Sequence, residues 1–567
     1  MNDWIAYFGP QNRYRFSLGE LKITDDNLSV FETGHCRFLN DRLMVHDDRF
    51  IMVIDGLILN RKELFNLYQT DDLAHLVVKM REKNPDDFFQ AFRGPFTGLF
   101  VEKNTHKAVV FTNQTGDSAV FCYQRGDLSV FSSNFYLLSQ FLKENRLPAT
   151  FGVQAAHWML TFGFQIDAST FIQEVHRLLP GKAMYLNNGC WSEVAYHRFQ
   201  SGDLTVSEEE AVEQIDGLFR QAVKRCFDKD LEYGYRQHLA DMSAGMDSRM
   251  VNVVAQALGY DKITNISYSQ TGSEEERLAK RAVQHLGNKL IFGTLDPHEF
   301  IFDLEKLTRM DFGTYLYCGI TGGERLLSKI DFNAFGAEQT GQLGDIAIGT
   351  FVKTASNAVN PSAVRCSNRL PLDSRYDVNP EHFENQDLYS LYTRGFLGAM
   401  SSWFVRKNYT FALSPFIDVD FMGFCYNLPL DYRRNHRLYW KWVKRYYPDA
   451  LTIPTSRKRI PETLFEKSVD FGQRGLHKAL RIGHKTLHGM GLTRSSVSAR
   501  SSMNPYQYWY DTDPAMRTFF NEYYSKNLSL LDDFPETAAE VRAMFESPVI
   551  LDKIMALTVL AARNVFF

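Results

Sequence analysis

Hydrophobic and polar positions divide the chain into a β-rich first part and a later part in which helices alternate with strands. Up to about residue 198, short apolar or alternating runs between turn residues predict strands. They lie at residues 50–54, 96–101, 108–112, 119–123, 128–132 and 183–186. Apolar side chains at helical spacing predict helices at residues 61–67, 74–81 and 134–142. Many strands with few helices indicate stacked sheets covered by helices.

From residue 207 onward, the spacing of apolar positions switches repeatedly between that of a helix and that of a strand. The predicted order is helix 207–226, a strand ending at Met242, helix 249–258, strand 263–269, helix 273–287 and strand 290–292. Ser273 and Glu276 have the spacing of a capping box at the start of the third helix. This order predicts a doubly wound parallel sheet, in which ligands bind outside the carboxyl ends of the strands.

The stretch Ser243-Ala-Gly-Met-Asp-Ser248 lies at such a carboxyl end, between a strand and a helix. Small residues at this turn allow backbone N–H groups and the helix dipole to meet an anion. Phosphate is the natural anion for such a site, and Asp247 is suited to hold its magnesium ion. Taken alone, the stretch is equally compatible with an ordinary capped turn.

Composition describes a globular protein with more than one domain. The chain has 567 residues, 44% of them hydrophobic and 23% charged, which is enough for two or more large domains. A net charge of −4 excludes a general attraction to nucleic acid or anionic lipid. The seven cysteines are scattered without a CxxC pair, which favours reduced thiols. Neither a signal peptide nor an apolar run of roughly 18 residues occurs, so we expect a cytoplasmic protein without a membrane span.

The first 200 residues resemble the glutaminase domain of the asparagine synthetases. The resemblance rests on residues 50–64, Arg93-Gly-Pro-Phe-Thr-Gly-Leu-Phe100, Phe131-Ser-Ser-Asn134 and Leu178-Leu-Pro-Gly181. It implies an Ntn-hydrolase-like domain of stacked β-sheets with helices over residues 1–200.

The nucleophile of that family is missing. In the family, a cysteine exposed by removal of Met1 attacks glutamine and releases ammonia. The corresponding positions here are Asn2 and Asp3, and neither side chain is a thiolate nucleophile. Cys36, next to His35, is better interpreted as a buried or incidental cysteine than as a replacement nucleophile.

The glutamine pocket of the family also differs here. The family's Asn-Gly-Glu stretch is Asp55-Gly56-Leu57, so an aliphatic side chain replaces a carboxylate. The family's aspartate before the glycine of its next motif is Arg93. We therefore expect a degenerate glutaminase domain that does not hydrolyse glutamine.

Residues 201–567 resemble the synthetase domain of the same family. The Ser243–Ser248 loop resembles the Ser-Gly-Gly-x-Asp-Ser loop of ATP pyrophosphatases, which split ATP between its α and β phosphates. Residues 272–287 match asparagine synthetases without a gap, and residues 413–418 resemble the family's Val-Pro-Phe-Leu-Asp stretch. Thr340-Gly-Gln-Leu-Gly-Asp345, after a strand-like run at residues 334–335, resembles the family's Ser-Gly-Glu-Gly-Ser-Asp-Glu. The resemblance implies an adenine nucleotide α-hydrolase-like domain that uses ATP and Mg²⁺.

The resemblance also assigns the site residue by residue. Asp247 and Asp345 would hold Mg²⁺ with pyrophosphate, and Asp345 would thereby act in catalysis. Lys458 would stabilise charge on the leaving pyrophosphate and on the tetrahedral intermediate, with Arg457 and Arg459 as alternatives in the same basic triplet. ATP contacts, mostly through backbone atoms, are expected from Met242, Ser243, Ala244, Gly245, Met246, Asp247, Ser248, Tyr268, Thr340 and Gly341.

Three residues depart from the family pattern in this domain. Ala244 replaces a loop glycine and adds a Cβ where the backbone would approach phosphate. Ile346 replaces a glutamate, and Phe411 stands near the position of another. The last two changes remove polar groups on the acceptor side, which indicates retained adenylation with a changed substrate.

A basic segment lies near the end of the chain. Residues 471–510 contain no Asp or Glu but several Lys, Arg and His residues. Such a run is usually a solvated face; otherwise it contacts an acidic substrate, nucleic acid or lipid headgroups. Residues 550–567 predict a closing apolar helix.

Together these features indicate an ATP-dependent amide-forming ligase of the asparagine synthetase type. It would adenylate a small-molecule, sugar-acid or peptide carboxylate and join it to an amine. That amine would come from ammonia, a partner glutaminase or the substrate itself, as in β-lactam synthetases and lasso-peptide cyclases. An RNA-modifying ATP pyrophosphatase and a nucleotide-binding scaffold are the alternatives. The substrates and a homodimeric state are left open.

Overall fold

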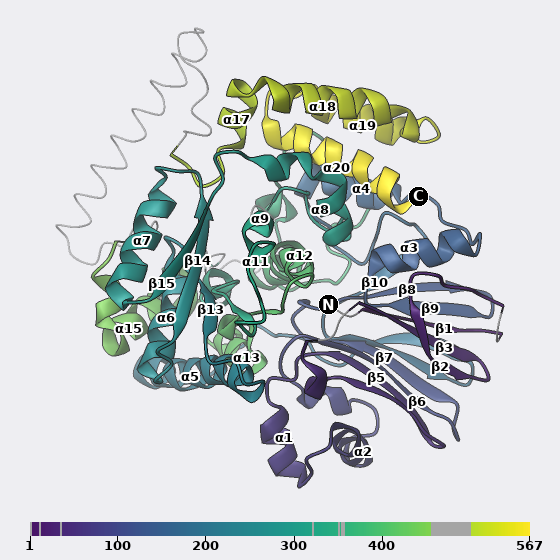
Figure 1. Ribbon diagram of the computed structural model, residues 1–567, viewed down its shortest axis with the longest axis horizontal. Helices are drawn as coiled ribbons and strands as arrows, with labels where there is room; N and C mark the ends of the chain where they lie inside the picture. The colour runs from purple at the N-terminus through teal and green to yellow at the C-terminus, as the bar shows by residue number, and fades with distance from the viewer. Residues whose placement is uncertain are drawn as a thin grey trace.

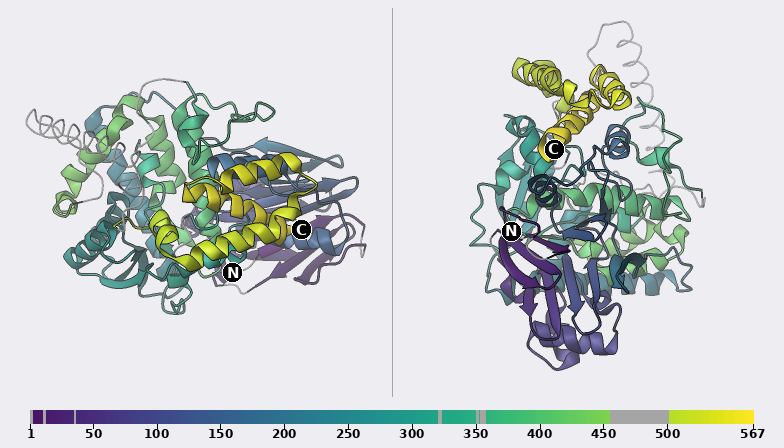
Figure 2. Two further views of the ribbon diagram at one scale, coloured as in Figure 1. Left: turned by 90° about the horizontal axis from the view of Figure 1, so that it is seen from above. Right: turned by 90° about the vertical axis from the view of Figure 1, so that its right-hand side faces the viewer.

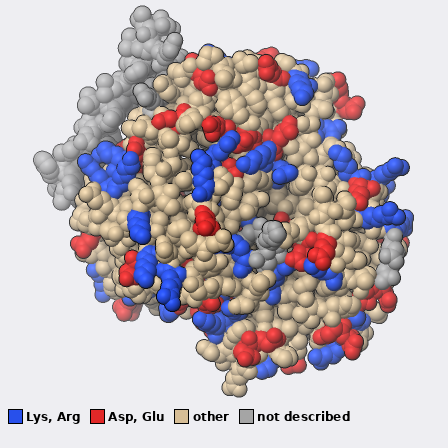
Figure 3. All heavy atoms as spheres, in the orientation of Figure 1, with Lys and Arg blue, Asp and Glu red and all other residues tan. Residues whose placement is uncertain are grey.

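The computed structural model describes residues 3–10, 13–34, 37–319, 323–349, 352, 358–454 and 501–567. These residues form two antiparallel sheets and one parallel sheet, with helices around them (Figure 1). Figure 3 shows positive and negative side chains interspersed over one face, as expected from the net charge of −4. Within the described ranges, no helix has both the length and the apolar character needed to cross a bilayer.

Two six-stranded antiparallel sheets stack against each other in the first 200 residues, as the short predicted strands indicate. Their strand orders are β10-β8-β9-β1-β3-β2 and β12-β11-β7-β6-β5-β4. Because side chains alternate along a strand, Trp4 and Val53 pack between the sheets while Ile5 and Ile54 lie on the outer faces. The strands are β1 (Asp3–Phe8), β2 (Glu20–Asp25), β3 (Leu28–Thr33), β4 (Leu43–His46), β5 (Phe50–Gly56), β6 (Phe96–Glu102), β7 (Lys107–Thr112), β8 (Val120–Arg125), β9 (Leu128–Ser132), β10 (Val175–Leu178), β11 (Lys182–Asn187) and β12 (Cys190–Ala195).

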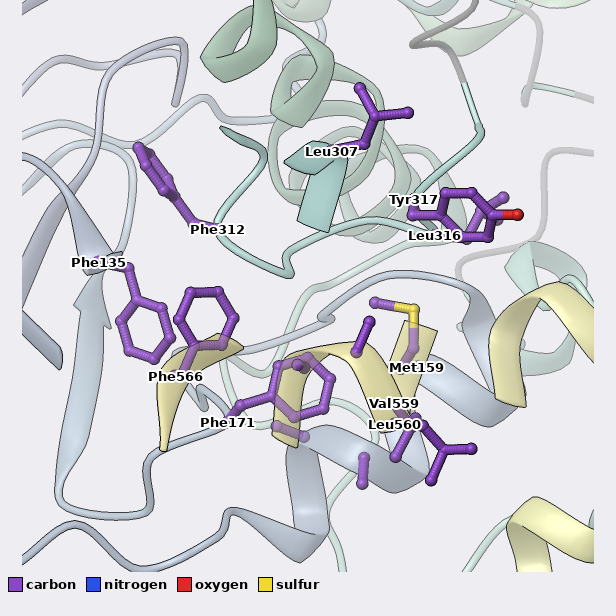
Figure 4. Packing of buried hydrophobic residues seen from close by; sticks show 14 of the residues in the cluster. Phe135, Met159, Phe171, Leu307, Phe312, Leu316, Tyr317, Val559, Leu560 and Phe566 are labelled. Carbon is purple, nitrogen blue, oxygen red and sulfur yellow. The ribbon is translucent and has the colours of Figure 1, made fainter. Parts of the chain in front are cut away.

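Helices cover both outer faces of this sandwich. The helices α1 (Arg61–Tyr68) and α2 (Leu73–Lys83) pack on the second sheet, and α3 (Phe135–Glu144), α4 (Val153–Phe162) and the C-terminal α20 (Ile550–Phe566) pack on the first. Figure 4 shows Phe135 and Phe566 facing each other in this core, with ring centroids 4.7 Å apart. The end of the chain thus shares a hydrophobic core with its beginning (Figure 2). The domain boundary at residue 200 stays a prediction.

The later part contains a five-stranded sheet of order β15-β14-β13-β16-β17, in which every neighbouring pair is parallel. The chain runs outward from β13 to β15 and then returns to the other side of β13. This reversal between β13 and β16 is a topological switch point, the usual place for a ligand crevice in such sheets. The strands are β13 (His238–Asp241), β14 (Ile263–Ser269), β15 (Lys289–Thr294), β16 (Glu338–Gln339) and β17 (Ala412–Leu413).

The prediction of a strand at residues 334–335 is wrong. The strand before Thr340 is β16, whose two residues are Glu338 and Gln339, both fully buried. A charged residue can occupy this buried strand because Arg406 Nε donates to both Glu338 carboxylate oxygens at 3.1 Å. A search for apolar runs does not find such a strand.

The three helices predicted beside the first strands of the parallel sheet are present as α5, α6 and α7. Ser207 and Glu210 form a capping box at the start of α5. At α7, Ser273 caps Glu276 N–H, but the Glu276 side chain accepts from Gly272 instead of Ser273, so the predicted box is incomplete. The α-helices described between residues 201 and 549 are α5 (Glu208–Glu232), α6 (Met246–Ala257), α7 (Glu274–Leu286), α8 (Leu304–Met310), α9 (Glu324–Leu327), α10 (Gly344–Ala347), α11 (Gln386–Ser390), α12 (Ser402–Arg406), α13 (Val419–Asn427), α14 (Leu430–Arg433), α15 (Arg437–Tyr446), α17 (Tyr506–Thr512), α18 (Pro514–Asn527) and α19 (Pro535–Phe545). Of these, α18 and α19 pack with α20 in the core on the first antiparallel sheet.

Candidate functional site

Two of the predicted motifs lie together at the switch point. The loop Ser243–Ser248 follows the carboxyl end of β13, and the turn Gly341–Asp345 follows the carboxyl end of β16. Because β13 and β16 are parallel neighbours, both segments leave the sheet at the same edge. The structure therefore brings the two motifs, far apart in the sequence, to one edge of the parallel sheet.

Serine hydroxyls fold the loop onto the start of α6. Ser243 N–H donates to Ser248 Oγ at 3.0 Å, and the two hydroxyl oxygens lie 2.8 Å apart. Gly245 N–H donates to Ser243 Oγ at 3.1 Å. Gly245 is also the N-cap of α6, and it has no side chain to satisfy the first N–H groups of the helix. The helix start is therefore suited to an anion.

Ala244 does not obstruct this loop. It is not among the non-glycine residues with positive φ, so the position does not require glycine. Its side chain is fully buried, which directs the methyl group into the protein. The Ala244 N–H donates to Glu275 Oε1 at 2.7 Å. A carboxylate oxygen thus already accepts from one loop N–H.

The Gly341–Asp345 turn packs directly against the start of α6. A Cβ at Gly341 would lie 2.4 Å from Ser248 N, and a Cβ at Gly344 would lie 2.7 Å from Asp247 Cγ. Asp345 follows Gly344 in the first turn of α10, and Tyr439 OH donates to Asp247 Oδ1 at 3.1 Å. Side-chain-free glycines are therefore what allow Asp247 and the Asp345 turn to approach.

The two carboxylates fit the predicted magnesium ion by donor type. Magnesium ions in phosphate sites take one or two protein carboxylates and complete their shell with water and phosphate oxygens. Among the described residues there is no group of three or more His, Cys, Asp or Glu side chains that could hold a metal. Asp247 and Asp345 would thus need phosphate oxygens to complete the coordination.

Leu343 is a feature of the turn that sequence reasoning missed. Its φ is +61°, in the left-handed region, although its side chain is buried. This conformation costs a non-glycine residue about 1–2 kcal/mol. The sequence could have indicated this positive φ, because the family motif has glycine at this position. Strain of this kind persists where surrounding packing fixes the backbone, as at many binding sites.

A second feature that the sequence did not reveal is a buried polar cluster, formed by Asp241, Tyr268, Glu338 and Arg406. Arg406 from α12 pairs with Glu338 and donates to Tyr268 OH at 3.3 Å. Burial, and then the charge of Glu338, raises the pKa of Asp241 well above its ordinary value. Burial also raises the pKa of Tyr268. Tyr268 therefore lies near the carboxyl end of β14, and the hydrogen bond from Arg406 holds its side chain in place.

The other predicted contacts are mostly buried. Met242 packs against Ala279 and Val283 of α7, so only its backbone is suited to meet a ligand. The Thr340 hydroxyl accepts from Gln342 N–H at 3.2 Å and helps to shape the turn. Met246, Ile346 and Phe411 belong to one hydrophobic cluster, which explains the apolar residues at the two departures from the family pattern.

Lys458, Arg457 and Arg459 lie outside the described residues, but the chain on both sides of them meets the site. Arg249 of α6 donates to the carbonyl oxygens of Ala450, Ile453 and Pro454 at 3.0, 2.6 and 3.1 Å. After residue 500, Gln270 N–H donates to Met503 O at 3.0 Å, next to the start of α7. Of the basic segment 471–510, only residues 501–510 are described.

The residues predicted to form a degenerate glutamine pocket contact the later part of the chain. Lys407 Nζ lies 3.0 Å from Asp3 Oδ1 and 3.4 Å from Asp55 Oδ2. Arg93 Nη2 pairs with Asp420 Oδ1 at 2.8 Å, and Leu57 is fully buried. Asp3, Asp55 and Arg93 thus have charged partners, and Leu57 packs in a hydrophobic cluster. Asn2 and Cys36 lie outside the described residues.

Comparisons with known proteins give one weak sequence relative. No family model matches the chain. It is 20% identical over 316 residues to "Asparagine synthetase [glutamine-hydrolyzing] 1" of Bacillus subtilis (strain 168). The match covers 54% of this chain and 48% of that protein, so the chain spans about half the length of the curated relative it matches. This similarity supports an enzyme related to the asparagine synthetases.

Solved structures match only at low scores. A glutamine phosphoribosylpyrophosphate amidotransferase from B. subtilis, complexed with ADP and GMP, has a TM-score of 0.25 and 8% identity, and covers 52% of this chain and 84% of that chain. An allosteric regulatory enzyme of purine biosynthesis has a TM-score of 0.24 and 7% identity, and covers 51% and 80%. Scores this low do not establish a shared fold.

Proposed function

We propose that the protein is an ATP-dependent ligase of the asparagine synthetase type, which activates a carboxylate by adenylation and joins it to an amine. The observation that carries the proposal is the meeting of the Ser243–Ser248 loop and the Gly341–Asp345 turn at the switch point of the parallel sheet. An uncapped helix start beside two carboxylates suits a magnesium-bound polyphosphate. The sequence similarity to an asparagine synthetase supports the same class.

In this proposal the loop backbone binds the phosphates of ATP. Asp247 and Asp345 would hold Mg²⁺, which neutralises charge on the departing pyrophosphate. Lys458, with Arg457 and Arg459 as alternatives, would add a positive charge that stabilises the same departing pyrophosphate. Arg249 donates to Pro454 O beside α6, and Lys458 follows four residues later in the sequence.

The reaction would have two steps. A carboxylate oxygen of the substrate would attack the α-phosphorus of ATP, and the bond from that phosphorus to the oxygen bridging to the β-phosphate would break, so that pyrophosphate leaves. The amine then attacks the acyl carbon of the acyl-adenylate, loses a proton, and displaces AMP. Donors held in place around the developing charge lower the barrier of both steps.

The nitrogen of the new amide would not come from glutamine hydrolysis in the N-terminal part of the chain. Asp3 pairs with Lys407, and Arg93 pairs with Asp420, so neither side chain is left for glutamine chemistry. Free ammonia, a partner glutaminase and an amine of the substrate itself all fit this arrangement. Release of glutamate from added glutamine would contradict this part of the proposal.

Product analysis tests the proposed function. The protein is incubated with Mg-ATP, ammonium and a panel of amino acids, sugar acids and peptides, and nucleotides are separated by chromatography. We expect AMP, rather than ADP, to form only with a carboxylate that fits. AMP formation that requires RNA and no carboxylate would favour an RNA-modifying pyrophosphatase. Nucleotide binding without turnover on any substrate would indicate a scaffold.

A further inference from the structure

Glu275 is an acidic side chain that reaches the proposed phosphate loop from a different helix. It is the second residue of α7, and its Oε1 accepts the hydrogen bond from Ala244 N–H at 2.7 Å. That N–H belongs to the loop that the proposed function assigns to the phosphates of ATP. A carboxylate oxygen therefore occupies a donor that a phosphate oxygen would use.

The neighbours of Glu275 on α7 make a different kind of contact. Glu276 pairs with Lys280 at 2.6 Å, and Glu274 lies 3.6 Å from Arg277. In the described part of the chain, no Lys, Arg or His forms an ion pair with Glu275. Of the three consecutive glutamates, Glu275 is thus the one whose charge faces the loop instead of a cation.

The surroundings of Glu275 disfavour its negative charge. Partial burial, and then the charge of Glu274, raises the pKa of the Glu275 carboxyl, and the Ala244 N–H only partly opposes this shift. A negative group that is partly desolvated and shares a donor with a phosphate would repel that phosphate. The side chain must move away before both can be accommodated.

We infer that Glu275 is an internal substitute for a phosphate oxygen, which satisfies the Ala244 N–H when no phosphate is bound and lowers the affinity of the loop for pyrophosphate. The inference rests on the proposed function, because it assumes that the loop binds phosphate. It assigns to α7 a role in setting nucleotide affinity.

The test compares Glu275→Gln with wild type and with Glu274→Gln. Glutamine keeps an oxygen acceptor for Ala244 N–H and removes only the charge, whereas Glu274→Gln makes the same change on the exposed side of the same helix turn. The probe is inorganic pyrophosphate with Mg²⁺, and its affinity is measured by isothermal titration calorimetry. We expect Glu275→Gln to bind about tenfold more tightly, the effect of removing one close like charge near a protein surface, while Glu274→Gln stays close to wild type.

The outcomes are distinguishable. Unchanged or weaker binding by Glu275→Gln, with wild type still binding pyrophosphate, would overturn the inference and leave the proposed function standing. Glu275→Ala supplies a second check, because it removes both the charge and the acceptor. Tighter binding by this variant supports repulsion, whereas weaker binding would show that Glu275 only orders the loop. If no variant and no wild-type protein binds pyrophosphate or ATP, the proposed function itself fails.

Discussion

Asp117 shows how tertiary packing changes a residue that the sequence places in a turn. Asp117 lies between the strands predicted at residues 108–112 and 119–123, where a turn is expected, but the structure buries its side chain. Burial raises the pKa of Asp117 to about 6, and hydrogen bonds from Asn113 and Thr115 only partly oppose this. In the unfolded chain the carboxyl has its ordinary pKa of 3.8. Between these two values the folded state holds one more proton, so the free energy of unfolding falls as pH rises.

Asp117→Asn should remove this pH dependence, because an amide does not ionise. Relative to wild type, the variant should gain stability progressively from pH 4 to pH 6, by up to about 3 kcal/mol at pH 7. Thermal unfolding of both proteins across this range provides the measurement. The control is Asp127→Asn, which changes an exposed turn residue of the same sandwich. A stability difference that does not change with pH would contradict the assignment.

Single residues of the site were only partly predictable. Ala244 replaces a family glycine and adds a Cβ to the loop, but its φ is not positive, so the backbone does not require glycine there. Leu343 replaces another family glycine and does take a positive φ. The sequence shows both substitutions and cannot distinguish them, because φ depends on packing around the turn. The contacts of Tyr439 and Glu275 with the loop were not predicted, because both residues lie far from the loop in the sequence.

At the scale of elements, amphipathic segments were predicted well. Strand β14 has the predicted bounds, and α7 begins one residue after its predicted cap. Both carry a clear spacing of apolar residues, which depends only on local sequence. Strand β16 was missed because its residues are polar, and β2 was not predicted because Ile23 is its one buried residue. Such strands exist because their neighbours in the sheet pair with them.

The interaction between α6 and residues 450–454 gives a prediction at this scale. Arg249 is buried and donates to three carbonyl oxygens of this segment, which leads toward Lys458. Arg249→Met should leave α6 in place but remove these donors, at a cost of about 1–3 kcal/mol. Because the approach of Lys458 would be lost, kcat for AMP formation should fall at least tenfold while pyrophosphate still binds. Kinetics of AMP formation, with a thermal unfolding curve, measure both effects.

Two further variants complete that experiment. Arg249→Lys retains one cationic donor and should recover part of the lost activity. Arg277→Met changes an exposed arginine of α7 and should behave as wild type. Full activity of Arg249→Met would show that the segment reaches the site without this arginine.

At the scale of the whole molecule, buried and half-buried ion pairs connect the antiparallel sandwich to the parallel-sheet region. Arg225 of α5 pairs with Glu63 and Asp418, and Arg93 pairs with Asp420. The partners are far apart in the sequence, so no local pattern could predict them. Breaking such a pair leaves a partly desolvated charge, which makes these contacts effective in fixing how the two regions meet.

The general architecture was more predictable than these contacts. The order of strands and helices indicated a sandwich followed by a parallel sheet, because each element carries its own periodicity. The order of motifs placed two carboxylates near one edge of that sheet, and the structure brings their segments together. The substrate could not be predicted, because Ile346 and Phe411, which depart from the family pattern, pack into a core and offer no chemistry that identifies a ligand.

Carboxylate-dependent exchange of labelled pyrophosphate into ATP tests the central claim most directly, because it requires a reversible acyl-adenylate. The wild type should catalyse exchange with at least one carboxylate of a broad panel. Asp345→Asn should reduce the rate about a hundredfold by weakening Mg²⁺ binding, without changing thermal unfolding. Asp261→Asn, at the opposite end of β14, should exchange at the wild-type rate. Absence of exchange with every carboxylate, or undiminished exchange by Asp345→Asn, would contradict the account.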